Sequence, residues 1–206
     1  MRKTTKRVLV RMVLVTILLG ILSLGFFLLH CQLQYTWMLS AAITMLTIFY
    51  HFAMRLLVGE AVTVIFRDKE FPQDRLGFRL YDFESTLYQK WKVKKWKVNV
   101  ITAKPEQFDL HQVSSEELLH NMMQAELVHR IIMILSFVPI LFILPFGAPI
   151  VFITTSIFAC LIDFIFVAIQ RYNRPRVMKY IDRSLRSVGC PPLHAAVECD
   201  HGGAEK

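Results

Sequence analysis

The sequence lacks the motifs by which several large enzyme classes are recognised. Its 206 residues contain no G-x-S-x-G nucleophile elbow, no P-loop and no G-x-G-x-x-G dinucleotide fingerprint. These absences argue against a hydrolase of the usual α/β type and against the common nucleotide-binding domains. They do not argue against acyl transfer, which requires none of these motifs.

Cysteine is also scarce, and its four copies are scattered. They are Cys31, Cys160, Cys190 and Cys199. No pair suggests a disulfide framework. The C-terminal tail adds His194 and His201, but the spacing of its cysteines and histidines matches no standard zinc pattern. We therefore expect no metal site, and a mobile, solvated tail.

Long apolar runs dominate what is present. The chain is 54% hydrophobic with a formal charge of +8, and its apolar residues form blocks rather than a 3.6 or 2.0 period, which is typical of membrane proteins. The blocks are Val8–Leu29, Trp37–Val58, Ile131–Phe146 and Ala148–Ile169. The third is short and contains Pro139 and Pro145, so it is either a full span or one arm of a re-entrant hairpin. We predict an all-α integral membrane protein with about four transmembrane helices.

The distribution of basic residues predicts the orientation. The turns at 30–36 and 145–149 contain no Lys or Arg, whereas 59–130 contains eleven and 171–186 contains six. By the positive-inside rule, both termini and the central segment are cytoplasmic, which requires an even number of spans. The first block is longer than a signal-peptide core and no A-x-A site follows it, so we expect an uncleaved span. The predicted organisation is a helical hairpin (1–58), a cytoplasmic interfacial segment (59–130), a second hairpin (131–186) and a tail (187–206).

The central segment contains FESTLYQKWKVKKWK, in which Trp91 and Trp96 alternate with lysines. Indole rings prefer the headgroup level of a bilayer, and lysines attract anionic lipids. Basic and aromatic residues also alternate in proteins that bind nucleic acid. With four spans attached, we expect membrane lipids as partners and no nucleic acid.

A helix is predicted from Ser115 onward. Ser114 with Glu117 three residues later forms a capping box. Further along, Glu126 and His129 are three residues apart and share a helical face. A carboxylate that accepts the imidazole N–H leaves the other ring nitrogen free to take a proton from a hydroxyl. A solvated helix face is the commoner explanation of an isolated E-x-x-H pattern.

Besides Arg11 near the start of the first block, three acidic or basic residues (histidine included) lie inside the apolar blocks. His51 and Arg55 are four residues apart near the end of the second block, and Asp163 lies about two turns inside the fourth. Ionisable groups at such depth are usually paired or line a polar cavity. Alternatively, Arg55 extends its charge to the interface and Asp163 is satisfied by a neighbouring helix. An interhelical pair of Arg55 with Asp163 is consistent with the sequence, which does not determine their depths.

The fourth block is followed directly by QRYNRPR, residues 170–176. In order, WKVKKWK, AELVH and QRYNRPR resemble the glycosyl-4,4'-diaponeurosporenoate acyltransferases, membrane enzymes of bacterial carotenoid biosynthesis. The resemblance covers about Phe83–Arg186. It implies a bacterial cell-membrane enzyme that transfers a fatty acyl chain to a hydroxyl on the sugar of a glycosylated terpenoid acid.

The resemblance suggests a mechanism with an acyl-CoA-type co-substrate and no cofactor. We expect His129, oriented by Glu126, to deprotonate the acceptor hydroxyl. The remaining candidates contact substrate. The arginines of QRYNRPR hold phosphates of the donor or a lipid headgroup, and Asn173 or Tyr172 donates to the oxyanion. His51 and Arg55 are second candidates for either role, and the others lie at the interface or in the spans. This substrate-binding set is Arg171, Tyr172, Asn173, Arg174, Arg176, His51, Arg55, Trp96, Lys97 and Asp163.

A second hypothesis is a non-catalytic membrane assembly or lipid-binding protein in which QRYNRPR only anchors a helix. Anchoring needs charge alone, so lysine should replace arginine at 171, 174 and 176 without damage. An enzyme that uses planar, bidentate arginine contacts should be damaged. Neither hypothesis identifies the acceptor, the acyl length or the oligomeric state.

Overall fold

The computed structural model describes residues 2–66, 78–96 and 114–187. Lys97 and the cysteines and histidines of the tail lie outside these residues. Every regular element in the described part is helical. Four helical stretches are long and apolar enough to cross a membrane, namely Val8–Leu33, Thr36–Ile65, Glu117–Phe146 and Pro149–Arg183. The predicted all-α architecture with four spans is confirmed.

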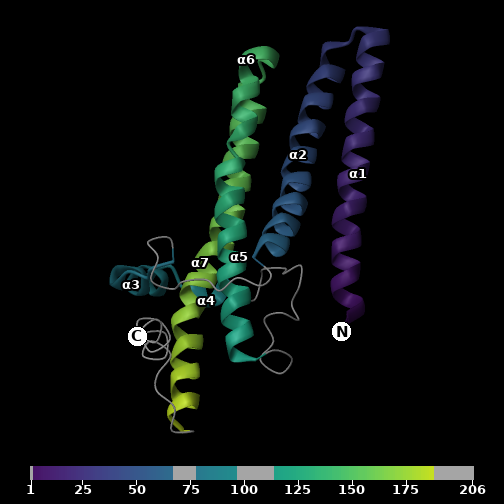
Figure 1. The fold of residues 1–206 in the computed structure, drawn as a ribbon. Coiled ribbons are helices and arrows are strands. Elements are labelled where there is room, and N and C mark those ends of the chain that lie inside the picture. The colour runs from purple at the N-terminus through teal and green to yellow at the C-terminus, as the bar shows by residue number, and fades with distance from the viewer. Residues whose placement is uncertain (1, 67–77, 97–113, 188–206) are drawn as a thin grey trace, which may run out of the picture.

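The first two spans form a hairpin of α1 (Arg2–Leu33) and α2 (Thr36–Ile65). They run side by side in Figure 1. Ser23 Oγ donates a hydrogen bond to Ala42 O at 3.0 Å. Gly20 lies against the Phe49 ring, where a Cβ atom would come within 3.2 Å of Phe49 Cε2. A small residue at 20 therefore lets the two helices pack closely.

The third span is continuous with the helix predicted from Ser115. In α5 (Ser115–Leu135), Ser114 is the N-cap and its Oγ accepts from Glu117 N at 3.1 Å, as predicted. The α-helix stops at Leu135, four residues before Pro139. Proline has no N–H to donate to the Leu135 carbonyl, and its ring would clash with that carbonyl in a continuous helix. The chain continues through the 3₁₀ helix η3 (Val138–Phe142) to α6 (Ile143–Phe146).

A tight turn leads from α6 into α7 (Pro149–Ser187). Gly147 has φ 69°, a left-handed conformation that favours glycine, and Pro149 is the first residue of the next helix. Because α5 supplies the first part of the third span, that span has full length and needs no re-entrant hairpin. The predicted domain boundaries at 58 and 130 fall inside α2 and α5.

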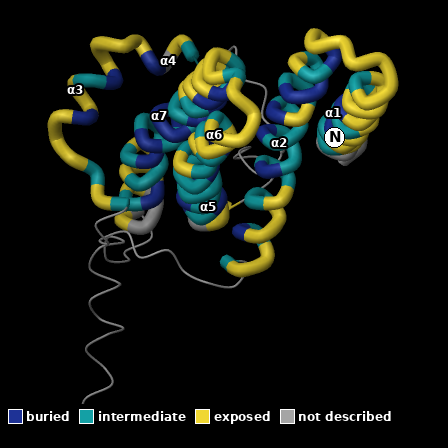
Figure 2. The backbone as a smooth tube through the Cα atoms, turned by 90° about the horizontal axis from the view of Figure 1, so that it is seen from above, coloured by how far each residue is buried: buried dark blue, intermediate teal, exposed yellow. Residues whose placement is uncertain are grey.

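The interfacial segment contains α3 (Asp82–Lys90) and α4 (Val93–Trp96). Figure 1 shows α3 lying across the direction of the long helices. Tyr88 and Val93 pack with Ala168 and Ile169 of α7 in a small buried cluster. Figure 2 shows the dark buried positions of α7 on the sides that face α5 and α4. We call this end of the bundle the α3 end and the opposite one the α6 end.

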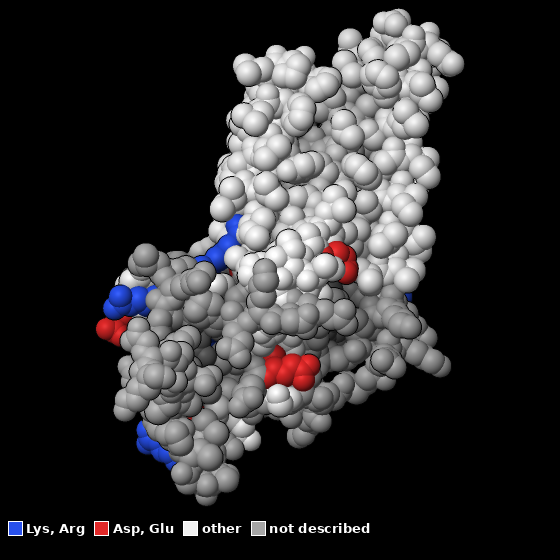
Figure 3. All heavy atoms as spheres, in the orientation of Figure 1, with Lys and Arg blue, Asp and Glu red and all other residues white. Residues whose placement is uncertain are grey.

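Charge is unevenly distributed along the bundle. In the face drawn in Figure 3, the blue and red side chains gather toward the α3 end, and the half toward α6 is white. The exposed side chains of the α6 half include Leu141, Leu144, Ile150 and Ile153. An apolar half with a charged end suits a bilayer and its headgroup region.

Candidate active site

Two layers of charged side chains lie within the bundle at the α3 end. The outer layer is an arginine–glutamate network, formed by Glu84, Glu126, Arg130, Arg171 and Arg174. Its centre is Glu126, which is 0% exposed. Arg171 Nη1 donates to Glu126 Oε1 at 2.7 Å and Arg174 Nη1 to Oε2 at 2.9 Å, while Arg130 pairs with Glu126 one turn along α5.

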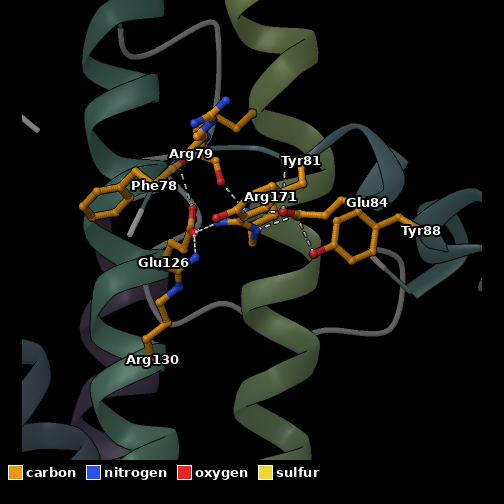
Figure 4. Close-up of polar contacts among 9 residues, drawn as sticks. Phe78, Arg79, Tyr81, Glu84, Tyr88, Glu126, Arg130 and Arg171 are labelled. Atoms are coloured by element: carbon orange, nitrogen blue, oxygen red, sulfur yellow. Dashed lines mark hydrogen bonds and ion pairs between the residues drawn. The ribbon is translucent and has the colours of Figure 1, made fainter. Parts of the chain in front are cut away.

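The same two arginines of α7 hold the start of α3. Arg171 Nε donates to Glu84 Oε2 at 2.6 Å, and its Nη2 donates to Arg79 O at 2.7 Å and to the second Glu84 oxygen. Arg174 Nη2 donates to Phe78 O. Figure 4 shows Arg171 between Glu84 and Glu126, with the backbone at Arg79 turned toward it. Planar guanidinium groups can make several such bonds at once, which an ammonium cannot.

This network corrects the prediction that Arg171 and Arg174 bind substrate. Arg171 is 7% exposed and Arg174 3%, and the guanidinium groups of both bind carboxylates and carbonyls of the protein. They are therefore not open to donor phosphates. Arg176 is exposed, and its guanidinium carbon lies 3.9 Å from the centroid of the Tyr172 ring. Of the three predicted arginines, Arg176 is the one at the surface.

The network also perturbs the ionisation of two α3 residues. Burial opposes the charge of Glu84, but the hydrogen bonds and charge of Arg171 outweigh it and lower the pKa of the carboxyl below its ordinary 4.5. Tyr88 O–H donates to Glu84 Oε2 at 3.1 Å. Burial and the adjacent Glu84 charge raise the pKa of Tyr88 to about 12. Glu84 is thus held as a carboxylate and Tyr88 as a neutral phenol.

The inner layer is a histidine–aspartate cluster, formed by Arg55, His129 and Asp163. Asp163 is 0% exposed and bridges two other helices. His129 Nδ1 of α5 lies 2.8 Å from Asp163 Oδ1, and Arg55 of α2 binds Oδ2. Arg55 also donates to His51 O at 3.0 Å and to Ala159 O at 3.3 Å. The interhelical pair of Arg55 with Asp163, which the sequence allows, is present.

The geometry determines the tautomer of His129. A carboxylate that pairs with Arg55 only accepts hydrogen bonds, so the proton of neutral His129 lies on Nδ1. The ring stacks on Phe166, with centroids 4.4 Å apart and planes inclined by 6°. The side chain is 20% exposed, and no hydrogen bond of Nε2 is formed with the described residues. In this tautomer, Nε2 carries a lone pair that no described residue binds.

The predicted pairing of His129 with Glu126 is wrong. Both oxygens of Glu126 bind arginines, and the carboxylate that orients His129 is Asp163, 34 residues further along the chain. Although Glu126 and His129 share a helical face, one residue belongs to the network and the other to the cluster. Asp163 thus takes the role that the sequence analysis gave to Glu126.

Tyr172 and Asn173 are not near the base. They follow Asp163 by nine and ten residues on one helix, which corresponds to about 14–15 Å along its axis. Tyr172 packs beside the cluster of Tyr88 and Val93, and its hydroxyl contacts Arg176. The structure therefore does not bring these two side chains to His129.

The tryptophans of the interfacial segment are evident in the sequence, but the contact of Trp91 with Phe164 is not. Trp96 is partly buried against the same small cluster, and Trp91 stacks with it at 6.5 Å between centroids. Trp91 also makes an edge contact with Phe164, the residue after Asp163. The two indoles thus lie beside the helix that supplies Asp163.

Within the described ranges, no group of three or more His, Cys, Asp or Glu side chains could hold a metal ion. The available chemistry is that of an oriented imidazole, an ion pair and an amphipathic surface. These features define the class of the protein: an all-α membrane protein with four spans, a carboxylate–imidazole pair and an aromatic, basic surface at the α3 end.

Comparison with known protein families gives this class a name. Residues 74–183, just over half of the chain, match the glycosyl-4,4'-diaponeurosporenoate acyltransferase family. The chain belongs to this family of acyltransferases of carotenoid biosynthesis. The match includes His129, Asp163 and the arginine–glutamate network, whereas His51 and Arg55 precede it. No curated protein and no solved structure matches the chain.

Proposed function

We propose that the protein transfers a fatty acyl chain from an acyl-CoA-type thioester to a hydroxyl of a glycosylated terpenoid or other glycolipid. One observation carries this proposal. Nδ1 of His129 lies 2.8 Å from the fully buried Asp163, while Nε2 forms no hydrogen bond with the described residues. An imidazole held in this way is the usual general base for activating a hydroxyl.

In the proposed step, Nε2 of His129 accepts the proton of the acceptor O–H as its oxygen attacks the thioester carbonyl carbon. A C–O bond forms and the carbonyl π electrons move to oxygen. When the tetrahedral intermediate collapses, the C–S bond breaks and the departing thiolate takes the proton from His129. The products are the acyl ester and the free thiol, and the base is restored.

Asp163 and Arg55 support the charged state of this cycle. Protonated His129 carries a positive charge inside the bundle, which Asp163 stabilises at 2.8 Å. Arg55 binds the carboxylate oxygen of Asp163 that His129 does not contact, so each charge in the cluster faces an opposite charge. The pair is therefore a positioning element for the imidazole.

The interfacial surface suits the polar parts of both substrates. Exposed cations of the α3 end would attract the phosphates of the donor, namely Lys90, Lys92, Lys95 and Arg176. The Trp91 and Trp96 faces would contact the glycosylated headgroup. Coenzyme A is cytoplasmic, which supports the orientation that the basic residues predict, with the α3 end and both termini on that side.

Comparative lipid analysis of a deletion strain tests the function. Loss of an acylated glycolipid, with accumulation of its deacylated precursor, is expected. The unsubstituted gene should restore the lipid, and a His129→Ala gene expressed at the same membrane level should not. An unchanged lipid profile would instead favour a non-catalytic membrane protein.

A further inference from the structure

A third polar level lies deeper in the bundle than the histidine–aspartate cluster. Ser156 precedes Asp163 by seven residues, two helical turns, so both lie on nearly the same face of α7 at positions about 10 Å apart. Ser136, the C-cap residue of α5, follows His129 by seven residues. Because α5 and α7 run in opposite directions (Figure 1), the contact of His129 with Asp163 also brings Ser136 to the level of Ser156.

His51 belongs to the same level. Arg55 of α2 reaches Ala159 O and Asp163 of α7, and these two helices run in the same direction, so the residue four before Arg55 lies near 155–159. Tyr50 O–H donates to Leu135 O at 2.9 Å, which ties α2 to α5 at this point. Three helices thus each place a polar residue at one depth.

Two of these three side chains form no hydrogen bond with the described residues. Ser156 is 0% exposed and His51 5%, yet neither Ser156 Oγ nor either ring nitrogen of His51 has a hydrogen-bond partner among the described residues. Ser136 Oγ, in contrast, donates to Ile132 O at 2.8 Å. Buried polar groups without partners cost free energy, and the cost is greatest in a membrane span. Such groups are retained where a ligand completes them.

We propose that His51 and Ser156 bind the carbonyl oxygen of a fatty acyl thioester, an inference that rests on the proposed function. A carbonyl oxygen has two lone pairs, and a neutral imidazole and a hydroxyl each supply one N–H or O–H donor. As the acceptor oxygen attacks, negative charge develops on this oxygen, and the two donors stabilise it.

This assignment determines how the acyl thioester lies along the bundle. The site lies deeper than His129, so the thioester enters from the α3 end and its coenzyme stays at the interfacial surface. The acyl chain extends toward the α6 end, where exposed side chains such as Leu141 and Leu144 are apolar. The carbonyl then lies between the base and the apolar half of the bundle.

The matched variants Ser156→Ala and Ser136→Ala test the site. Each removes one buried hydroxyl, but only the Ser156 hydroxyl is free to donate to a ligand. We expect Ser156→Ala to lower kcat with palmitoyl-CoA by about 10²-fold, the effect of one oxyanion donor, and Ser136→Ala to stay within about threefold of the unsubstituted protein. Equal losses in the two variants would overturn the proposal.

Two measurements separate binding from structure. Hexadecyl-CoA thioether has no carbonyl, so its Kd should be unchanged in Ser156→Ala; a weaker Kd that matches the loss in kcat would show a structural role and overturn the proposal. The infrared carbonyl stretch of ¹³C-carbonyl palmitoyl-CoA should move to lower frequency on binding. That shift should be reduced in Ser156→Ala and in His51→Phe.

The infrared result is independent of turnover. If the unsubstituted protein shifts the carbonyl band but transfers no acyl chain, the proposed function fails and the carbonyl site stands. If transfer occurs without any shift, or with a shift that both variants retain, the carbonyl site fails and the proposed function stands.

Discussion

At the scale of single residues, Asp163 is the centre of the candidate site because it contacts both Arg55 and His129. It is one fully buried carboxylate with a cation on one oxygen and an imidazole on the other. Removing the charge while keeping the shape should leave Arg55 uncompensated and let an amide N–H face Nδ1, which favours the wrong tautomer of His129. The residue thus controls both the charge and the proton position of the base.

Asp163→Asn should therefore lower the acyl-transfer rate by roughly 10²–10⁴, the range that a general base supplies. The measurement is kcat/KM of the purified protein in detergent with palmitoyl-CoA and the glycolipid acceptor. Glu117→Gln removes an exposed carboxylate near the start of α5 and serves as the control. Equal rates in the two variants would show that Asp163 has no role in the chemistry.

Glu84 predicts a pH dependence of stability. Arg171 lowers the pKa of its carboxyl below 4.5, so the folded state binds the proton more weakly than the unfolded state. The stabilisation is then present above the ordinary pKa and is lost as pH falls through the lower, folded value. Tm measured from pH 7 to pH 3 should fall in the acid range.

Glu84→Gln should lose about 2 kcal/mol at neutral pH, the value of a hydrogen bond to a charged group. It should also flatten the acid part of the profile. Asp82→Asn, an exposed position two residues earlier, is the control. An acid limb that is identical in Glu84→Gln and the unsubstituted protein would remove Glu84 as its cause.

The sequence predicted individual residues of the site better than their contacts. Ionisable groups inside apolar blocks are conspicuous, so His51, Arg55 and Asp163 were found, and the Arg55–Asp163 pair was foreseen. The carboxylate partner of His129 was not, because spacing on one helix shows which residues share a face but not which helix lies opposite. The packing of α5 against α7 places Asp163 beside His129.

At the scale of elements, the two arginines of α7 fasten α3 across the bundle. Arg171 alone binds Glu84, Glu126 and the Arg79 carbonyl. Lysine at 171 or 174 would damage the protein whether or not it is an enzyme, because the lost bonds are internal. The substitution of lysine for arginine can therefore distinguish the anchoring hypothesis from the substrate-binding hypothesis only at exposed Arg176.

Arg171→Lys should destabilise the protein by about 3 kcal/mol, since one ammonium cannot replace the fork that joins two buried carboxylates. Tm in detergent measures this loss. Trypsin should also cleave faster at Lys90, Lys92 or Lys95 as α3 and α4 detach. Arg176→Lys, at an exposed position, should stay within about 0.5 kcal/mol. Equal Tm values for the two variants would contradict the role of the fork.

Helices were predictable from the sequence, but their docking was not. The capping pattern located the start of α5, and the apolar blocks located the spans, yet α2 and α7 extend well beyond their blocks. Each extension contains at least one charged residue but also buries an apolar side chain, Val62 in α2 and Ile181 in α7. Glu84 was missed because nothing local shows that its partner is an arginine 87 residues away.

At the scale of the molecule, charge separates along the bundle and predicts its orientation. Exposed Cys31 lies in the last turn of α1, and residues 30–36 at this end of the hairpin contain no Lys or Arg. In a variant whose other three cysteines are serine, a membrane-impermeant maleimide should label Cys31 in intact cells. A cysteine placed at exposed Ser85 of α3 should label only after permeabilisation. The reverse pattern would invert the proposed orientation.

A double-mutant cycle on the acyl-transfer rate tests the central claim most directly. If Asp163 acts through His129, the two behave as one unit and their effects are not additive. We predict that His129→Gln lowers kcat by roughly 10²–10⁴ and that adding Asp163→Asn lowers it little further. Near-normal turnover in His129→Gln, or two fully multiplicative losses, would contradict a base formed by His129 and Asp163.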